Sequence, residues 1–271
     1  MPQGRWAPAM VIVLKTVFPA VLISLWLGLS PSSSQAEISQ ANQAESAAAF
    51  QAVDALARQT RAAADLPRWS NPDHAKVLGR FWDVKATLGA PPYRPADVPA
   101  LLPVIDRAGS LFKTYVLFAP QAGMVPDTAA NTAKYQDEIA RAGAYLLRVQ
   151  AAGLEAISDF LATLPAAQMN AARRDGLRKI RLGINEMVTG IVLMLRSPGL
   201  RSENQAILLD ALAEGAATLA ASTAPADRTA LVAQVNTVLA SLSGPERAKA
   251  LAFKAAFERK ECTGLCAMEA Q

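Results

Sequence analysis

Residues 135–161 read YQDEIARAGAYLLRVQAAGLEAISDFL, and the fold follows from their pattern. Large apolar side chains recur at spacings of three, four, seven and eight residues, which places them on one face of an α-helix. Such a face has to be covered by other parts of the chain. We therefore predict a long, buried helix over residues 127–162. The apolar line consists of Tyr135, Ile139, Leu146, Leu154, Ile157 and Leu161.

A second long helix is predicted directly afterwards, over residues 165–196. Pro165 leaves almost no loop between the two segments, and a connection this short favours an antiparallel hairpin. Gly183 and Gly190 lie one heptad apart in this helix, where we expect them to admit a neighbouring helix. Its apolar line consists of Leu177, Ile180, Ile184, Met187, Ile191 and Met194.

Helical spacing continues through the rest of the chain, and no segment alternates apolar and polar residues as a strand would. Asn71 before Pro72 is typical of a helix start. Thr163, Thr223 and Ser243 each precede a proline by two residues, so we expect their hydroxyls to cap helices as well. The chain is predicted to be an all-α bundle of about seven or eight helices. The remaining predicted helices are 38–65, 72–88, 101–118, 202–221, 225–242 and 245–260.

The N-terminus has the layout of a secretory signal peptide. Arg5 and Lys15 precede an apolar run from Val17 to Leu29, and small residues lead up to Ala36. We predict a signal peptide at 1–36 that is cleaved after Ala36, which makes the protein secreted or periplasmic. The alternative is a retained anchor, because the apolar stretch approaches the ~20 residues that a membrane span needs.

The predicted mature chain, residues 37–271, forms one helical-bundle domain without a transmembrane span. Its first part, 37–70, is rich in Ala and Gln and has few large apolar side chains. Such a segment has high helix propensity but little to bury, so we expect a loosely docked N-terminal helix.

Composition argues against several classes of function. Residues 1–36 carry two basic and no acidic residues, so the net charge of +4 becomes +2 in the predicted mature chain, which is too small to indicate a nucleic-acid-binding protein. His74 is the only histidine, so no multi-histidine metal site is possible. His74 would also have to serve any serine or cysteine nucleophile as its base, yet it falls in the first turn of a predicted helix. We predict no cofactor, and a protein that is not an enzyme.

Basic residues cluster at the start of the second long helix, against the single acid Asp175. One interpretation is a solvated helix face, in which Asp175 pairs with the residues three and four positions later. The other is a patch that binds an anion or an acidic partner, such as lipid headgroups or another anionic component of the cell envelope. The cluster consists of Arg173, Arg174, Arg178, Lys179 and Arg181.

Glu186 falls in the apolar part of the same helix. A buried carboxylate costs several kcal/mol unless it is paired. The side chain therefore either forms an ion pair or is an acid with a raised pKa in a pocket.

Cys262 and Cys266 are the only cysteines. The spacing is one residue too long for haem attachment, and Ala267 stands where the iron-binding histidine would be. Copper binding with help from Met268 and His74 is a further alternative, but it is typical of a fold with strands. A redox pair would prefer a helix N-terminus. We predict a small disulfide near the C-terminus, which suits an oxidising compartment.

These observations favour an exported, non-enzymatic binding or structural module of the cell envelope. A second hypothesis is a carrier that holds an apolar or anionic small ligand between the long helices, near Arg178 and Glu186. A third is a hydrolase or another enzyme that uses His74 or Glu186.

Overall fold

The computed structural model describes residues 38–121, 123–262 and 265–268. Every regular element in these residues is helical, so the predicted all-α bundle is confirmed. The predicted signal peptide, residues 1–36, lies outside the described residues.

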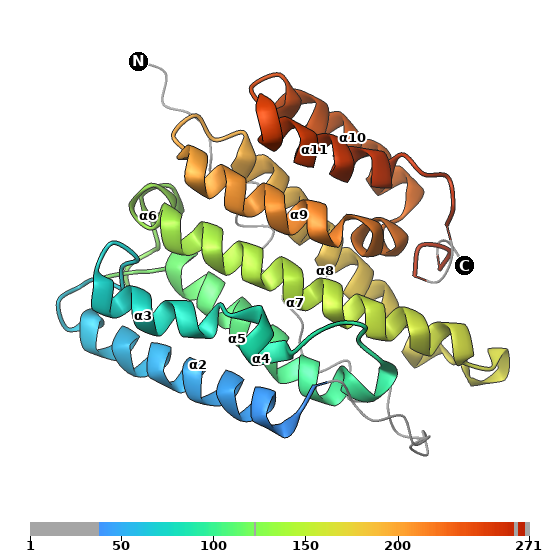
Figure 1. Ribbon diagram of the computed structural model, residues 1–271, viewed down its shortest axis with the longest axis horizontal. Helices are drawn as coiled ribbons and strands as arrows, with labels where there is room; N and C mark the ends of the chain where they lie inside the picture. Colours follow the sequence, from blue (N-terminus) through green and yellow to red (C-terminus); the bar gives the residue numbers. More distant parts are fainter. Residues whose placement is uncertain (1–37, 122, 263–264, 269–271) are drawn as a thin grey trace.

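The helix α7 (Gln136–Thr163) crosses the middle of the molecule, as Figure 1 shows. Its most extensive contacts are with one helix on each side, α5 and α9. One side of α7 is formed by α2 (Gln40–Arg61), α3 (Pro72–Phe81), α4 (Val84–Leu88) and α5 (Val98–Val116). The other side is formed by α9 (Ser202–Ser222), α10 (Pro225–Leu239) and α11 (Gly244–Phe257).

Small residues allow this central position of α7. A Cβ atom on Gly143 would lie 2.9 Å from Cδ1 of Ile191, 3.5 Å from a ring carbon of Phe112 and 3.6 Å from Cδ2 of Leu208. These three side chains belong to α8, α5 and α9. Gly143 is therefore the point where three helices converge on α7.

The second long helix, α8 (Ala171–Leu195), runs back antiparallel to α7 after the short 3-10 turn Ala166–Gln168 (Figure 1). This is the predicted hairpin. The buried face of α8 packs more extensively against α9 and α10 than against α7. The C-terminal third of the chain thus covers α8, while α7 is shared by both sides of the bundle.

Two predicted helices are each divided in the structure. The backbone turns at Trp82, and the Asp83 side chain then caps α4 by accepting from the N–H of Ala86. The second break is at Tyr135, between α6 (Thr128–Lys134) and α7. The Tyr135 ring is fully buried against Tyr115 and Phe118, so the chain bends where this ring enters the core.

The segment between α2 and α3 is fastened to the start of α7. The Trp69 N–H donates to the Glu138 carboxylate, which also lies 3.5 Å from the Arg68 guanidinium. The Tyr115 hydroxyl donates to the Pro67 carbonyl at 2.9 Å, and the Tyr135 hydroxyl donates to Asp65 at 2.5 Å. These bonds fix the end of α7 from which α6 departs.

Candidate functional site

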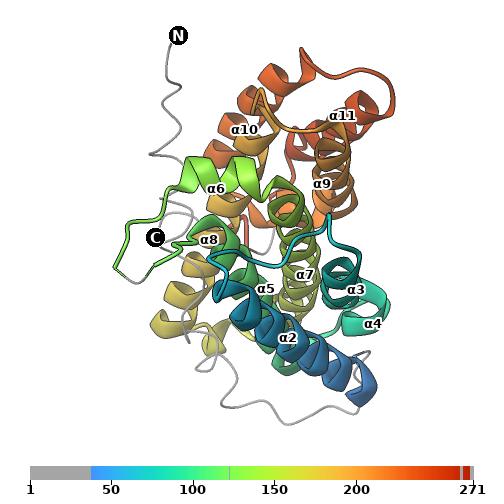
Figure 2. The ribbon, with the colours of Figure 1, turned by 90° about the vertical axis from the view of Figure 1, so that its left-hand side faces the viewer.

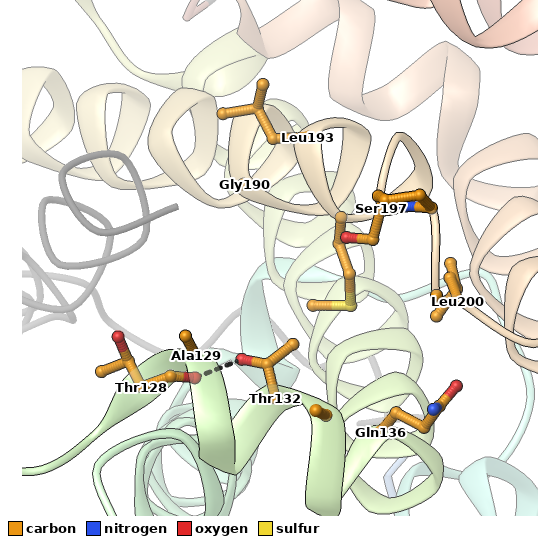
Figure 3. Close-up of a pocket in the computed structure, with 12 residues that line it drawn as sticks. Thr128, Ala129, Thr132, Gln136, Gly190, Leu193, Ser197 and Leu200 are labelled. Atoms are coloured by element: carbon orange, nitrogen blue, oxygen red, sulfur yellow. Dashed lines mark hydrogen bonds between the residues drawn. The ribbon is translucent and has the colours of Figure 1, made fainter. Parts of the chain in front are cut away.

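A hollow lies between α6 and the C-terminal half of α8, and the loop that joins α8 to α9 closes one end of it (Figure 3). Its volume is about 280 Å³. Figure 2 shows that α6 and α8 lie on the side of the bundle away from α3 and α4. Its lining residues are Thr128, Ala129, Thr132, Ala133, Gln136, Gly190, Leu193, Met194, Ser197, Pro198, Gly199 and Leu200.

Small side chains create the hollow. Ala129, Ala133 and Gly190 line its helical walls and leave between α6 and α8 the space that larger residues would fill. The bend at Tyr135 directs α6 away from the axis of α7, so α7 does not fill the space. The pocket therefore follows from a backbone bend combined with small residues on both walls.

The loop at the end of the pocket is well anchored. The Ser197 N–H donates to the Met194 carbonyl at 2.9 Å, and the Leu200 N–H donates to the Ser197 carbonyl at 3.1 Å. The Gln136 side-chain oxygen accepts from the Arg201 N–H at 3.0 Å and from the Asn204 amide at 3.2 Å. These bonds hold the loop in one conformation, so the pocket is pre-formed.

The chemistry of the lining is apolar with a few neutral polar groups. Met194, Leu193 and Leu200 supply the largest apolar surfaces, and none of the described residues that line the pocket is charged. Thr132 and Ser197 lie on opposite sides of it in Figure 3. Within the described part of the chain, the Ser197 hydroxyl has no hydrogen-bond partner. This lining fits an apolar molecule that carries a neutral polar group.

A second, much smaller cavity lies elsewhere in the interior. A cavity of only about 20 Å³ lies between α5, α7 and α8, and one of its walls is Gln150. The Gln150 side chain is 4 % exposed, and its carbonyl oxygen has no partner in the described residues. A space of this size holds about one water molecule, which would satisfy that oxygen.

The structure divides the predicted basic patch. Arg178 and Lys179 are exposed and pair with Asp175 at 3.2 and 2.7 Å, so the ion pairs expected for a solvated face are present. Arg174 is exposed as well. Arg173 and Arg181 are buried, and Arg173 donates to the Gln168 carbonyl at 2.5 Å. These residues do not line the pocket.

Glu186 and His74 lie apart from the pocket lining too. Burial raises the pKa of the Glu186 carboxyl, and the side chain is half-buried. His74 accepts a hydrogen bond from the Arg68 N–H on Nδ1 at 3.1 Å, which ties the start of α3 to the preceding loop. The lone pair on Nδ1, which a catalytic base would need in order to accept a proton, is thus engaged with the backbone.

Cys262 and Cys266 form the predicted disulfide, with their Cα atoms 5.2 Å apart. Cys266 is fully buried, and its N–H donates to the Ala221 carbonyl at the end of α9. In the described ranges, no group of three or more His, Cys, Asp and Glu side chains is arranged to hold a metal ion. No helix in those ranges has the length and apolar character that crossing a bilayer requires.

The pocket was not predicted from the sequence. Its residues are mainly Ala, Thr, Gly, Ser and Pro, which have no distinctive chemistry and occur in any helix or turn. Gly190, which we expected to admit a neighbouring helix, lines the pocket. Gly190 is followed on the same face of α8 by the large residues Leu193 and Met194, so no change of residue size in the sequence marked the pocket.

No family model matches the chain, and neither a curated protein nor a solved structure is significantly similar to it.

Proposed function

We propose that this chain is an exported helical-bundle protein that binds a small apolar ligand in the pocket between α6 and α8. The observation that carries the proposal is the pocket itself, a pre-formed hollow of about 280 Å³ in a bundle whose apolar side chains form one buried core. Sites for small molecules are typically apolar concavities of roughly 300 Å³ or more with a few polar groups. At about 280 Å³ this pocket lies just below that range, which favours a compact ligand.

The lining chemistry narrows the class of ligand. An anionic headgroup would find no cation among the described lining residues, whereas a hydroxyl or carbonyl group would find the Ser197 hydroxyl. Burial of apolar ligand surface would supply most of the affinity, at about 25 cal/mol per Å² before the costs of association. The ligand is therefore a neutral, mainly hydrocarbon molecule with a polar group at one end.

A binding role fits the described residues better than catalysis. General acid–base catalysis requires a titratable group within hydrogen-bond reach of the substrate. None of the described lining residues titrates near neutral pH, and His74 is tied to the backbone of Arg68. Export is supported by the signal-peptide pattern at 1–36 and by a disulfide between the only two cysteines.

Titration with the neutral fluorophore N-phenyl-1-naphthylamine tests the proposal. Wild-type protein should bind it saturably, with a single site. The variant Gly190→Phe places a large side chain on the pocket wall and should weaken binding at least tenfold. Ala252→Phe adds the same side chain to the exposed face of α11 and should bind as the wild type does.

Comparison with the Ala252→Phe control also shows whether the probe binds unspecifically. Each variant is first checked for an unchanged circular-dichroism spectrum and thermal midpoint. If a folded Gly190→Phe variant bound the probe as tightly as the wild type, the pocket would not be the binding site.

A further inference from the structure

Arg228 in α10 connects the helical bundle to the C-terminal segment. Its side chain is 5 % exposed, and Nε donates to the Thr223 carbonyl at 2.9 Å. One terminal nitrogen donates to the carbonyls of Arg259 and Glu261, both at 2.9 Å. The other donates to Sγ of Cys266 at 3.1 Å. The guanidinium thus lies directly against one sulfur of the disulfide.

This guanidinium has no counter-ion in contact with it in the part of the chain that the structure describes. Its oxygen partners are three backbone carbonyls, which are dipoles without a net charge. Burying a charge without an opposite charge is costly. A negative charge on Cys266 Sγ would therefore be strongly stabilised by Arg228.

The two cysteines differ in access to solvent. Cys266 is fully buried and fixed by its backbone bond to Ala221, and Leu265 beside it is only 1 % exposed. Cys262 is partly exposed. A reagent in solution can therefore reach Cys262 and not Cys266.

We propose that Cys262 and Cys266 form a thiol–disulfide exchange site, in which Cys262 is the sulfur attacked and Cys266 is the leaving group held by Arg228. The thiolate of an external thiol attacks Sγ of Cys262 and forms a new sulfur–sulfur bond with it. The bond between Cys262 and Cys266 breaks, and its electron pair stays on Cys266 as a thiolate. Charge is conserved, and no proton has to be delivered.

Two general properties of thiols support this direction of exchange. A neighbouring arginine lowers the pKa of a thiol, and a leaving thiol of lower pKa departs faster.

Glu261 is the acid whose charge acts on Arg228, and its side chain is exposed together with Glu258, Arg259 and Lys260. Solvent screens these four charges, so the buried guanidinium dominates at Cys266. A purely structural disulfide would need no cation in contact with its buried sulfur.

The first experiment uses the oxidised full-length chain and reduced glutathione, with acid quenching and peptide mapping by mass spectrometry. We expect the glutathione adduct on Cys262 and a free thiol at Cys266. Arg228→Gln should slow adduct formation about tenfold or more, and Arg228→Lys should retain part of the rate. Arg247→Gln is the matched control, because Arg247 also donates to a backbone carbonyl, that of Leu239, without contacting a cysteine.

The second experiment does not depend on how well the Arg228 variants fold. In Cys262→Ser, thiolate absorbance at 240 nm against pH reports the pKa of the Cys266 thiol. We expect a value well below the ordinary value of about 8.5. An adduct on Cys266, an equal rate in folded Arg228→Gln, or a thiol pKa at or above the ordinary value would each overturn the proposal.

Discussion

Individual residues in this protein act mainly through how closely they let helices approach. Gly143 illustrates this, because a Cβ atom at its position would contact the side chains of Ile191, Phe112 and Leu208. Gly79 in α3 is the opposite case, since a Cβ there would make only ordinary contacts, at 3.6 and 3.7 Å, with the Trp69 ring. The same residue type therefore permits close helix packing at one position and is dispensable at the other.

This contrast predicts opposite effects on stability. Gly143→Val should destabilise the fold by about 1–3 kcal/mol through overpacking. Gly79→Ala should stabilise it by about 0.5–1 kcal/mol, because alanine loses less backbone entropy than glycine in a helix. Urea unfolding measures both changes. A stabilising Gly143→Val would show that α7 is not packed as closely as the structure indicates.

Two carboxylates near the start of α7 have pKa values shifted in opposite directions. Burial raises the pKa of Glu138, although the Trp69 N–H and the Arg68 charge lower it in part. Burial also acts to raise the pKa of Asp65, but hydrogen bonds from Tyr135, Lys134 and the Leu66 N–H outweigh it and lower the pKa.

The pH dependence of stability should therefore differ in sign for the two groups. The raised pKa of Glu138 makes the wild type lose stability relative to Glu138→Gln as pH rises from about 4.3, the ordinary value for Glu, through the folded-state pKa. The lowered pKa of Asp65 contributes stability above the ordinary Asp value of about 3.9, and this is lost as pH falls through the folded-state pKa. Urea midpoints of the wild type, Glu138→Gln and Asp65→Asn between pH 2.5 and 7 measure both differences. Parallel pH profiles for the two variants would contradict these assignments.

The helix caps were only partly predictable from the local sequence. Asn71 caps α3 as predicted, by accepting from the N–H groups of Asp73 and His74. Thr163 and Thr223 instead donate their hydroxyls to carbonyls of the helix that precedes them, and α8 is capped by Asn170. A hydroxyl between two helices can serve either one, and packing decides which.

At the scale of elements, the helical faces were predictable and the breaks were not. The apolar lines of α7 and α8 face the core as their spacing indicated, and only Ile157 and Leu161 in them are partly buried rather than buried. The break at Tyr135 depends on Tyr115 and Phe118, which are distant in sequence, and residues 128–134 are compatible with a continuous helix. The pocket depends on this break, so the site could not be found without the fold.

The helix α2 should be the least protected of the long helices. Its buried residues are small, namely Ser46, Ala49, Val53 and Ala57. Polar contacts also hold α2, including the hydrogen bond that the Asn42 side-chain amide donates to the Ala86 carbonyl at 2.9 Å. Hydrogen exchange followed by mass spectrometry should show faster exchange in α2 than in α7, because opening α2 exposes less apolar surface. Equal protection of the two helices would argue against the loosely docked N-terminal helix that the sequence predicts.

At the scale of the whole molecule, export should leave a mature chain that begins at Glu37. The signal-peptide pattern ends in small residues up to Ala36, and removal of 1–36 would also remove the apolar run Val17–Leu29. N-terminal sequencing of the protein purified from the medium or the periplasm measures the cleavage site. A chain that begins at Met1 and sediments with membranes would support the retained anchor instead.

We propose that the bundle packed around α7 keeps a pre-formed apolar pocket between α6 and α8 for a ligand. Amide chemical shifts, recorded while N-phenyl-1-naphthylamine is added to isotope-labelled protein, show where the probe binds. We predict saturable changes concentrated at Ala129, Gly190, Ser197 and Gly199, with little change in α2 or α11. Changes spread over the surface, or confined to residues outside the pocket, would contradict it.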